Sequence, residues 1–105
     1  MTPGADRPTR WIRQVRYDPG RVLVTLDSGY LSVGNAKWTR GMAALGITDP
    51  MGHALLVERL KADPPSYQAL GTLFGMSRQR AHQLVRRAGS RLYRLLLAQE
   101  APTHV

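Results

Sequence analysis

The chain has 105 residues, 43% of them hydrophobic, and carries a formal net charge of +8. This length predicts one domain with one modest core, and the apolar content excludes a wholly disordered chain. The lack of cysteine excludes disulfides and thiolate metal sites, while the charge indicates a polyanionic partner such as nucleic acid. The sequence contains neither an apolar leader nor a run of about 18 apolar residues, so we expect a cytoplasmic protein with no membrane partner.

The first third of the chain predicts an arm followed by an antiparallel β-meander. Residues 1–10 contain two prolines and show no periodicity, which indicates a mobile arm. Short strands are expected between residues 11 and 33, separated by turns around Gly20 and Gly29. In the first strand, alternation assigns one face to Trp11, Val15 and Tyr17 and the opposite face to Ile12, Gln14 and Arg16.

Two helices are expected next. The first covers about residues 36–45, with Asn35 as its N-cap and Gly46 after its last turn. The second begins after the N-cap Asp49 and runs to about Ala62. The predicted buried stripes of the two helices are Trp38, Met42 and Leu45, and then Met51, Leu55, Leu56 and Leu60.

A helix-turn-helix is predicted from about Ser66 to Gly89. Ser66 is placed to cap a short helix and Ser77 to cap a longer one, and Gly75 opens the tight turn between them. Gly71 costs its helix about 1 kcal/mol relative to Ala, which close packing of the two helices would compensate. The apolar residues expected on the inner faces are Leu70, Phe74, Met76, Ala81, Leu84 and Val85.

The longer helix of this motif separates into an apolar face and a basic face. Its predicted core stripe is Ala81, Val85, Ala88 and Leu92. No acidic residue lies between Asp63 and Glu100, although six arginines do, whereas a solvated helix face usually mixes both signs. Arg and Gln pair well with guanine and adenine, and flanking arginines hold phosphates. We predict base contacts from Arg78, Gln79, His82, Gln83 and Arg86, and phosphate contacts from Ser66, Ser77, Arg80, Arg87, Arg91 and Arg94.

Residues 74–84, which read FGMSRQRAHQL, resemble the helix-turn-helix in region four of the primary bacterial sigma factors. The similarity covers about Ser66 to Leu96. In that family, an Arg-Glu-Arg-hydrophobic-Arg-Gln stretch follows the turn and reads the promoter −35 element. The resemblance implies a bacterial or phage transcription protein in which Arg78, Gln79, His82 and Gln83 read bases. Gln79 stands where the family usually has Glu and His82 where it has Arg, and the remaining chain lacks the aromatic-rich segment that melts a −10 element.

These elements predict an α+β fold, with a short N-terminal antiparallel β-meander packed on a helical core that ends in the helix-turn-helix. The meander is too small to be stable alone, so it must pack on the helices. The expected organisation is an arm (1–10), a meander plus helix (11–48), the helix-turn-helix region with an extended C-terminal helix (49–97), and a tail (98–105).

The expected function is sequence-specific binding of double-stranded DNA to regulate transcription, with no catalysis, cofactor or metal. Two alternatives remain open: a module that contacts RNA polymerase or a sigma factor through the meander, and a nonspecific nucleic-acid-binding protein. The histidines are too scattered for a metal site, and no catalytic nucleophile or acid pair stands out. Three adjacent leucines, residues 95–97, exceed what one small core can bury and indicate a possible homodimer. The aromatic residues Trp11, Tyr17, Tyr30 and Trp38 are assigned to the core.

Overall fold

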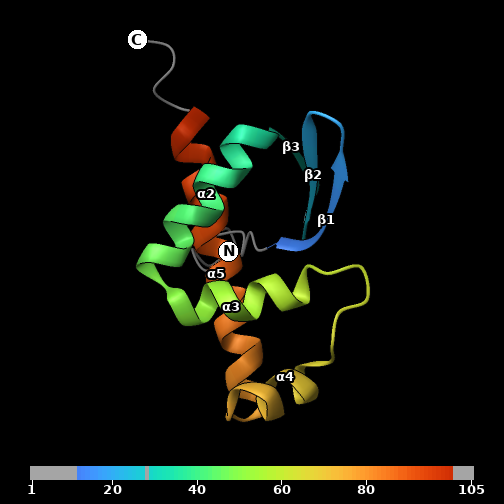
Figure 1. Cartoon of the computed structure of the whole chain (residues 1–105), viewed down its shortest axis with the longest axis vertical. Helices are drawn as coiled ribbons and strands as arrows, with labels where there is room; N and C mark the ends of the chain where they lie inside the picture. The colour runs from blue at the N-terminus through green and yellow to red at the C-terminus, as the bar shows by residue number, and fades with distance from the viewer. Residues whose placement is uncertain (1–11, 28, 101–105) are drawn as a thin grey trace, which may run out of the picture.

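The computed structural model describes residues 12–27 and 29–100, in which a three-stranded sheet precedes four helices (Figure 1). The strands are β1 (Ile12–Asp18), β2 (Arg21–Leu26) and β3 (Gly29–Gly34), paired antiparallel in the order β1-β2-β3. The helices are α2 (Asn35–Thr48), α3 (Pro50–Arg59), α4 (Tyr67–Phe74) and α5 (Arg78–Glu100). The α+β fold with an N-terminal meander is therefore confirmed. The predicted arm, Trp11, Ser28 and residues 101–105 lie outside the described residues.

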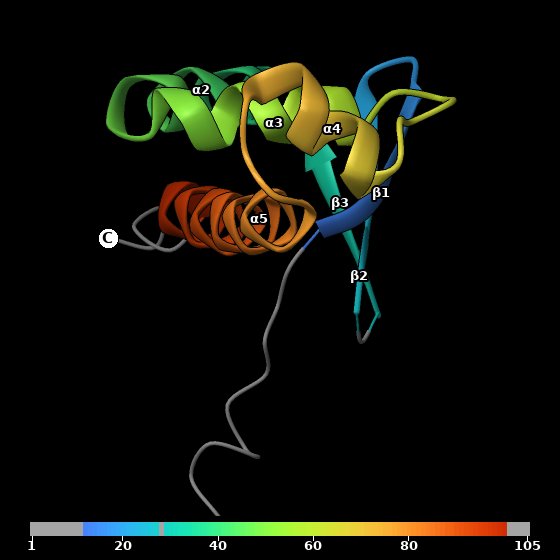
Figure 2. The same ribbon diagram turned by 90° about the horizontal axis from the view of Figure 1, so that it is seen from below.

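The long helix α5 is the element on which the others are assembled. It has 23 residues, so it extends for about 35 Å. The helices α2, α3 and α4 all pack against α5, and β1 also contacts it. Viewed along its axis, α5 has these helices on one side and the sheet beside them (Figure 2). The short helix α4 lies near the N-terminal end of α5 (Figure 1), so this end of the molecule consists of the predicted helix-turn-helix.

The hydrophobic core fills the space between the inner face of the sheet and the helices. Each strand and each helix contributes buried apolar side chains to it. The α5 residues of the predicted stripe are all buried, which confirms that interpretation. The largest fully buried side chains are Ile12, Leu45, Leu55, Leu56, Leu70, Leu92, Leu96, Val22, Val24, Val33 and Val85.

The predicted facing of β1 is wrong at Ile12, which is buried rather than on the outer face. The pairing with β2 shifts between Ile12 and Gln14, so Arg13 is an extra residue in a β-bulge. Because side chains alternate with a period of two, one extra residue moves everything before it to the other face. Ile12 therefore joins Val15 on the core side.

The helix junctions differ partly from prediction. β3 passes directly into α2, so Gly34 is the N-cap and Asn35 is already helical, without a side-chain cap. The helix also continues through Gly46 to Thr48. The cap of α3 is as predicted, because Asp49 Oδ1 accepts a hydrogen bond of 3.1 Å from the Gly52 amide.

One exposed side chain and two helix boundaries also differ from the prediction. Met51 is 46% exposed, since it lies on the outer side of the first turn of α3. α3 ends at Arg59 rather than near Ala62. α5 continues through residues 98–100, which were predicted to belong to a tail. Within residues 12–27 and 29–100, none of the helices combines the length and the apolar character that a membrane span requires.

Candidate nucleic-acid interface

Two serine caps and a left-handed glycine set the angle between α4 and α5. The hydroxyl of Ser66 accepts a hydrogen bond of 3.0 Å from the Ala69 amide, and that of Ser77 accepts one of 3.1 Å from the Arg80 amide. Gly75 adopts φ 71° and ψ 38°, a conformation that favours glycine because it has no Cβ. These predicted caps and the turn are confirmed. Both serine side chains are thus engaged in capping.

The reason for glycine at position 71 is a close approach of backbone to backbone. A Cβ on Gly71 would lie 2.5 Å from the carbonyl oxygen of Met76 and 3.1 Å from the carbonyl carbon of Ser77. The Met76 amide also donates a hydrogen bond of 2.8 Å to the Gly71 carbonyl. The predicted tight packing is therefore present, but its partner is the backbone of the turn rather than a side chain of α5.

The N-terminal half of α5 exposes one basic and amide-bearing face. The exposed side chains on this face are Arg78, Gln79, Arg80, Gln83 and Arg87, and His82 and Arg86 are half-buried. Among the described residues, no carboxylate forms an ion pair with Arg78, Arg80 or Arg87. Arginine charges without an internal counter-charge are available to an external anion.

His82 belongs to a small cluster that joins three helices. Its ring packs edge-on against that of Tyr67, with 4.5 Å between the ring centroids. The guanidinium carbon of Arg59, in the last turn of α3, lies 4.3 Å from the centroid of the same Tyr67 ring. Arg59 Nη1 also donates a hydrogen bond of 2.8 Å to the Pro65 carbonyl. Sequence reasoning missed Arg59 and Tyr67, because nothing local shows that the residues after α3 fold back over its end.

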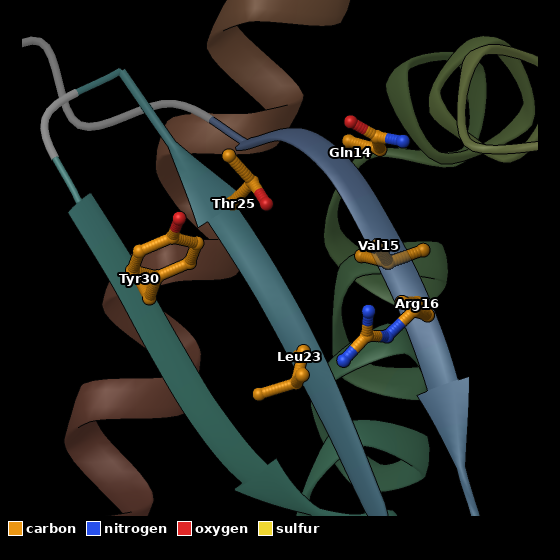
Figure 3. A pocket seen from close by; sticks show the side chains of 6 residues that line it. All are labelled: Gln14, Val15, Arg16, Leu23, Thr25 and Tyr30. Carbon is orange, nitrogen blue, oxygen red and sulfur yellow. The ribbon is translucent and has the colours of Figure 1, made fainter.

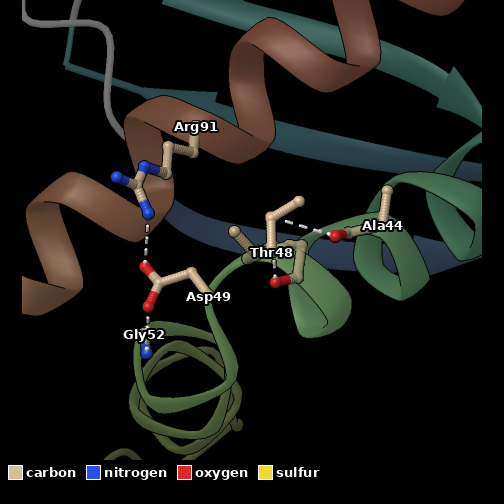
Figure 4. Close-up of polar contacts among 6 residues, drawn as sticks. Ala44, Thr48, Asp49, Gly52 and Arg91 are labelled. Carbon is tan, nitrogen blue, oxygen red and sulfur yellow. Dashed lines mark hydrogen bonds and ion pairs between the residues drawn. The ribbon is translucent and has the colours of Figure 1, made fainter.

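The four arginines predicted to contact phosphate fall into two groups. Arg80 and Arg87 lie beside the exposed face of the helix-turn-helix, whereas Arg91 and Arg94 lie in the C-terminal half of α5. Arg91 Nη1 is 3.2 Å from Asp49 Oδ2, an ion pair without hydrogen-bond alignment (Figure 4). The Asp49 side chain is only 12% exposed. Arg91 thus has an anionic partner inside the protein, at the junction of α2 and α3.

The outer face of the sheet is not covered by any described helix (Figure 3). It forms a hollow lined in part by Arg16, Leu23, Thr25 and Tyr30. Tyr30 is 81% exposed, so its assignment to the core is wrong. The physical reason is alternation along β3, which places Leu31 and Val33 on the core side and Tyr30 on the other. Trp38 is buried as predicted. The assignment of Tyr17 to the core is also wrong, since Tyr17 is 61% exposed and only the edge of its ring meets that of Trp38, with 6.3 Å between the ring centroids.

The consecutive leucines near the end of α5 are mostly accommodated by this one chain. Leu96 is 1% exposed and Leu95 packs against the core, whereas Leu97 is 39% exposed. The core holds more of them than expected because both α2 and α3 pack against α5. The apolar surplus that suggested a homodimer is therefore reduced to a single side chain.

The described part of the chain contains no group of three histidine, aspartate or glutamate side chains that could hold a metal ion. Comparisons of the chain with protein-family models, with curated proteins and with solved structures found no match. The resemblance to sigma region four therefore rests on residues 66–96 alone.

Proposed function

We propose that this protein binds double-stranded DNA sequence-specifically and regulates transcription, with the N-terminal half of α5 in the major groove. The observation that carries the proposal is the exposed face of that half. Arg78, Arg80 and Arg87 lie on it without a carboxylate partner in the described residues, beside the exposed amides of Gln79 and Gln83. An α-helix fits the major groove, where Arg reads guanine and Gln reads adenine.

Within this face, we assign base contacts and phosphate contacts to different residues according to their positions on α5. Arg78, Gln79 and Gln83 lie in the first two turns of α5, the part that enters the groove in a helix-turn-helix. Arg80 and Arg87 flank them and neutralise phosphates, which releases counterions and makes the affinity depend on salt. His82 and Arg86 border the same face but are half-buried, so they reach fewer base edges.

The rigidity of α5 supports this mechanism. Its C-terminal half is buried in the core through Leu92 and Leu96, and the N-terminal half continues from it without a break. The caps at Ser66 and Ser77 hold α4 against the start of α5. A recognition surface that is already ordered loses little conformational entropy on binding, so more of the contact energy appears as affinity.

A protein-contacting module is the second candidate, and one observation favours it. On the outer face of the sheet, exposed Tyr30 and Arg16 lie beside Leu23, which is half-buried. No described element covers these side chains. Aromatic and arginine side chains are enriched in protein interfaces. A partner such as RNA polymerase or a sigma factor would then bind the sheet, while α4 and α5 contribute weak DNA binding.

Selection of bound sites from a pool of random duplexes separates these candidates. An enriched motif supports the regulator, whereas tight binding without a motif indicates a nonspecific nucleic-acid-binding protein. Failure to bind duplex would contradict the proposal and favour the protein-contacting module. The Gln83→Ala variant should lose preference at one position of the motif. The Arg40→Ala variant, which removes a charge from α2 at the other end of the molecule, should select the wild-type motif.

A further inference from the structure

A second basic surface lies along the seam between β1 and the end of α3. The seam contains a hollow of about 420 Å³, and a neighbouring hollow of about 230 Å³ shares several of its residues. Arg13 and Gln14 of β1 and Arg59 of α3 line both hollows. Tyr67 lines the larger one.

Arg59 is held in place before any ligand arrives. Its guanidinium stacks on Tyr67 and uses one of its five N–H donors for the Pro65 carbonyl. Among the described residues, no carboxylate pairs with it. The neighbouring Lys61 differs, because its ammonium lies 2.9 Å from Glu58 and is neutralised there. A stacked guanidinium with free donors and no counter-charge is suited to a phosphate.

Arg13 reaches the same seam because of the β-bulge. Bulges at a sheet edge re-aim side chains, and β1 is an edge strand whose pairing with β2 shifts at this residue. Arg13 is exposed and, within the described part of the chain, has no acidic partner. The sheet and α3 thus each supply one unpaired arginine to a single groove.

The seam is connected to the recognition surface through Tyr67. This side chain also lines a hollow of about 260 Å³ that is bordered by Arg78, Gln79 and His82. A ligand that follows both hollows must carry repeated negative charges over a continuous length, as a nucleic-acid backbone does and an isolated anion does not. We propose that the seam binds the phosphodiester backbone of the same DNA duplex, with Arg13 and Arg59 contacting phosphates beside the groove that α5 enters. This inference rests on the proposed function.

The test measures binding of a labelled random-sequence duplex by fluorescence anisotropy over a series of salt concentrations. The variants are Arg13→Gln, Arg59→Gln and the double variant. Each lost phosphate contact should make the slope of log affinity against log salt concentration shallower by about 0.9. If a single variant and the wild type bind equally at ~1 M salt, the variant should bind up to about eightfold more weakly than the wild type at ~0.1 M salt. The control that removes the same formal charge is Arg16→Gln, because Arg16 lies on the same strand but points to the outer face of the sheet, where its Nε lies 3.7 Å from Asp18 Oδ1 (Figure 3).

The outcomes distinguish this inference from the proposed function. If the wild type shows no salt-dependent binding of duplex, both fail. If the wild type binds but the double variant keeps its affinity and slope, only the seam assignment is overturned. An Arg16→Gln variant that loses as much slope as Arg13→Gln would also overturn it, since binding would then depend on net charge alone. If thermal unfolding shows that Arg59→Gln perturbs the fold, Arg13→Gln alone decides the test. Arg13 is exposed, so we expect its replacement to leave the fold intact.

Discussion

The N-terminal half of α5 carries four arginines and the C-terminal half two, and the two halves use them differently. In the N-terminal half, Arg80 and Arg87 are exposed, and no described carboxylate pairs with them. In the C-terminal half, Arg91 forms an ion pair with Asp49. Gln99, near the end of that half, also has partners within the protein. Its amide nitrogen donates a hydrogen bond to the Lys37 carbonyl, and its amide oxygen accepts one from Arg40 Nε.

This difference shows that a run of arginines without nearby acids in the sequence is not uniformly a ligand-binding surface. The interval from Asp63 to Glu100 has no acidic residue, yet the fold supplies Asp49 to one of its arginines from outside the interval. Both halves bury apolar side chains, among them Val85 in the N-terminal half and Leu92 in the C-terminal half. The halves differ in the partners of their arginines, so we expect substitution of exposed, unpaired Arg87 to weaken DNA binding and substitution of Arg91 or of a buried side chain to lower stability.

The largest expected effect is on stability, at a buried leucine in the C-terminal half of α5. Leu92 is fully buried, so Leu92→Ala should lower the free energy of unfolding by about 2–5 kcal/mol. Leu97 is 39% exposed, and Leu97→Ala should cost far less. Chemical denaturation of both variants measures this. Equal losses would mean that the C-terminal half is not packed as described.

The next effect concerns the turn of the helix-turn-helix. The Cβ in Gly71→Ala would press on the Met76 carbonyl, and we expect a loss of about 1–3 kcal/mol. The matched control is Gly46→Ala, where the new Cβ would lie 3.6 Å from the His53 ring. That contact is ordinary and the site is inside a helix, so this variant should gain about 0.5–1 kcal/mol. A stable Gly71→Ala protein in thermal unfolding would refute the close approach.

The base-reading residues should control preference rather than overall affinity. Arg78→Ala and Gln83→Ala should each lose about 1–3 kcal/mol of binding on the selected site and less on random duplex. Titration of both duplexes with each variant gives the ratio of dissociation constants. If both variants retain the wild-type ratio, the assignment of this face to base recognition is wrong.

The features that could be predicted from the sequence are those decided within a few residues. The caps at Asp49, Ser66 and Ser77 join a side chain to an amide three residues later, so residue type and position suffice. The apolar and exposed faces of α5 follow from helical periodicity in the same way.

The features that were missed depend on contacts between distant segments. The bulge in the pairing of β1 with β2 reverses which face the preceding side chains point to, so Ile12 was predicted on the wrong face. The burial of Leu96 requires knowing that α2 also packs on α5. Likewise, Arg59 becomes a candidate contact only because the chain returns over α3 to place Tyr67 beneath its guanidinium. For the site, periodicity predicts which side chains face outward, whereas the partner of each charge depends on the tertiary fold.

The comparison between Arg87→Ala and Arg91→Ala separates the two uses of arginine in α5, because the two variants remove the same charge from the two halves of one helix. The measurement is the slope of log affinity against log salt on duplex DNA, together with thermal unfolding. Arg87→Ala should flatten the slope by about 0.9 and leave stability unchanged. Arg91→Ala should keep the wild-type slope and lose up to about 1 kcal/mol of stability, since its ion pair with Asp49 is partly exposed. Equal slopes for Arg87→Ala and the wild type, or a flatter slope for Arg91→Ala, would mean that the first arginine does not contact DNA phosphate or that the second one does.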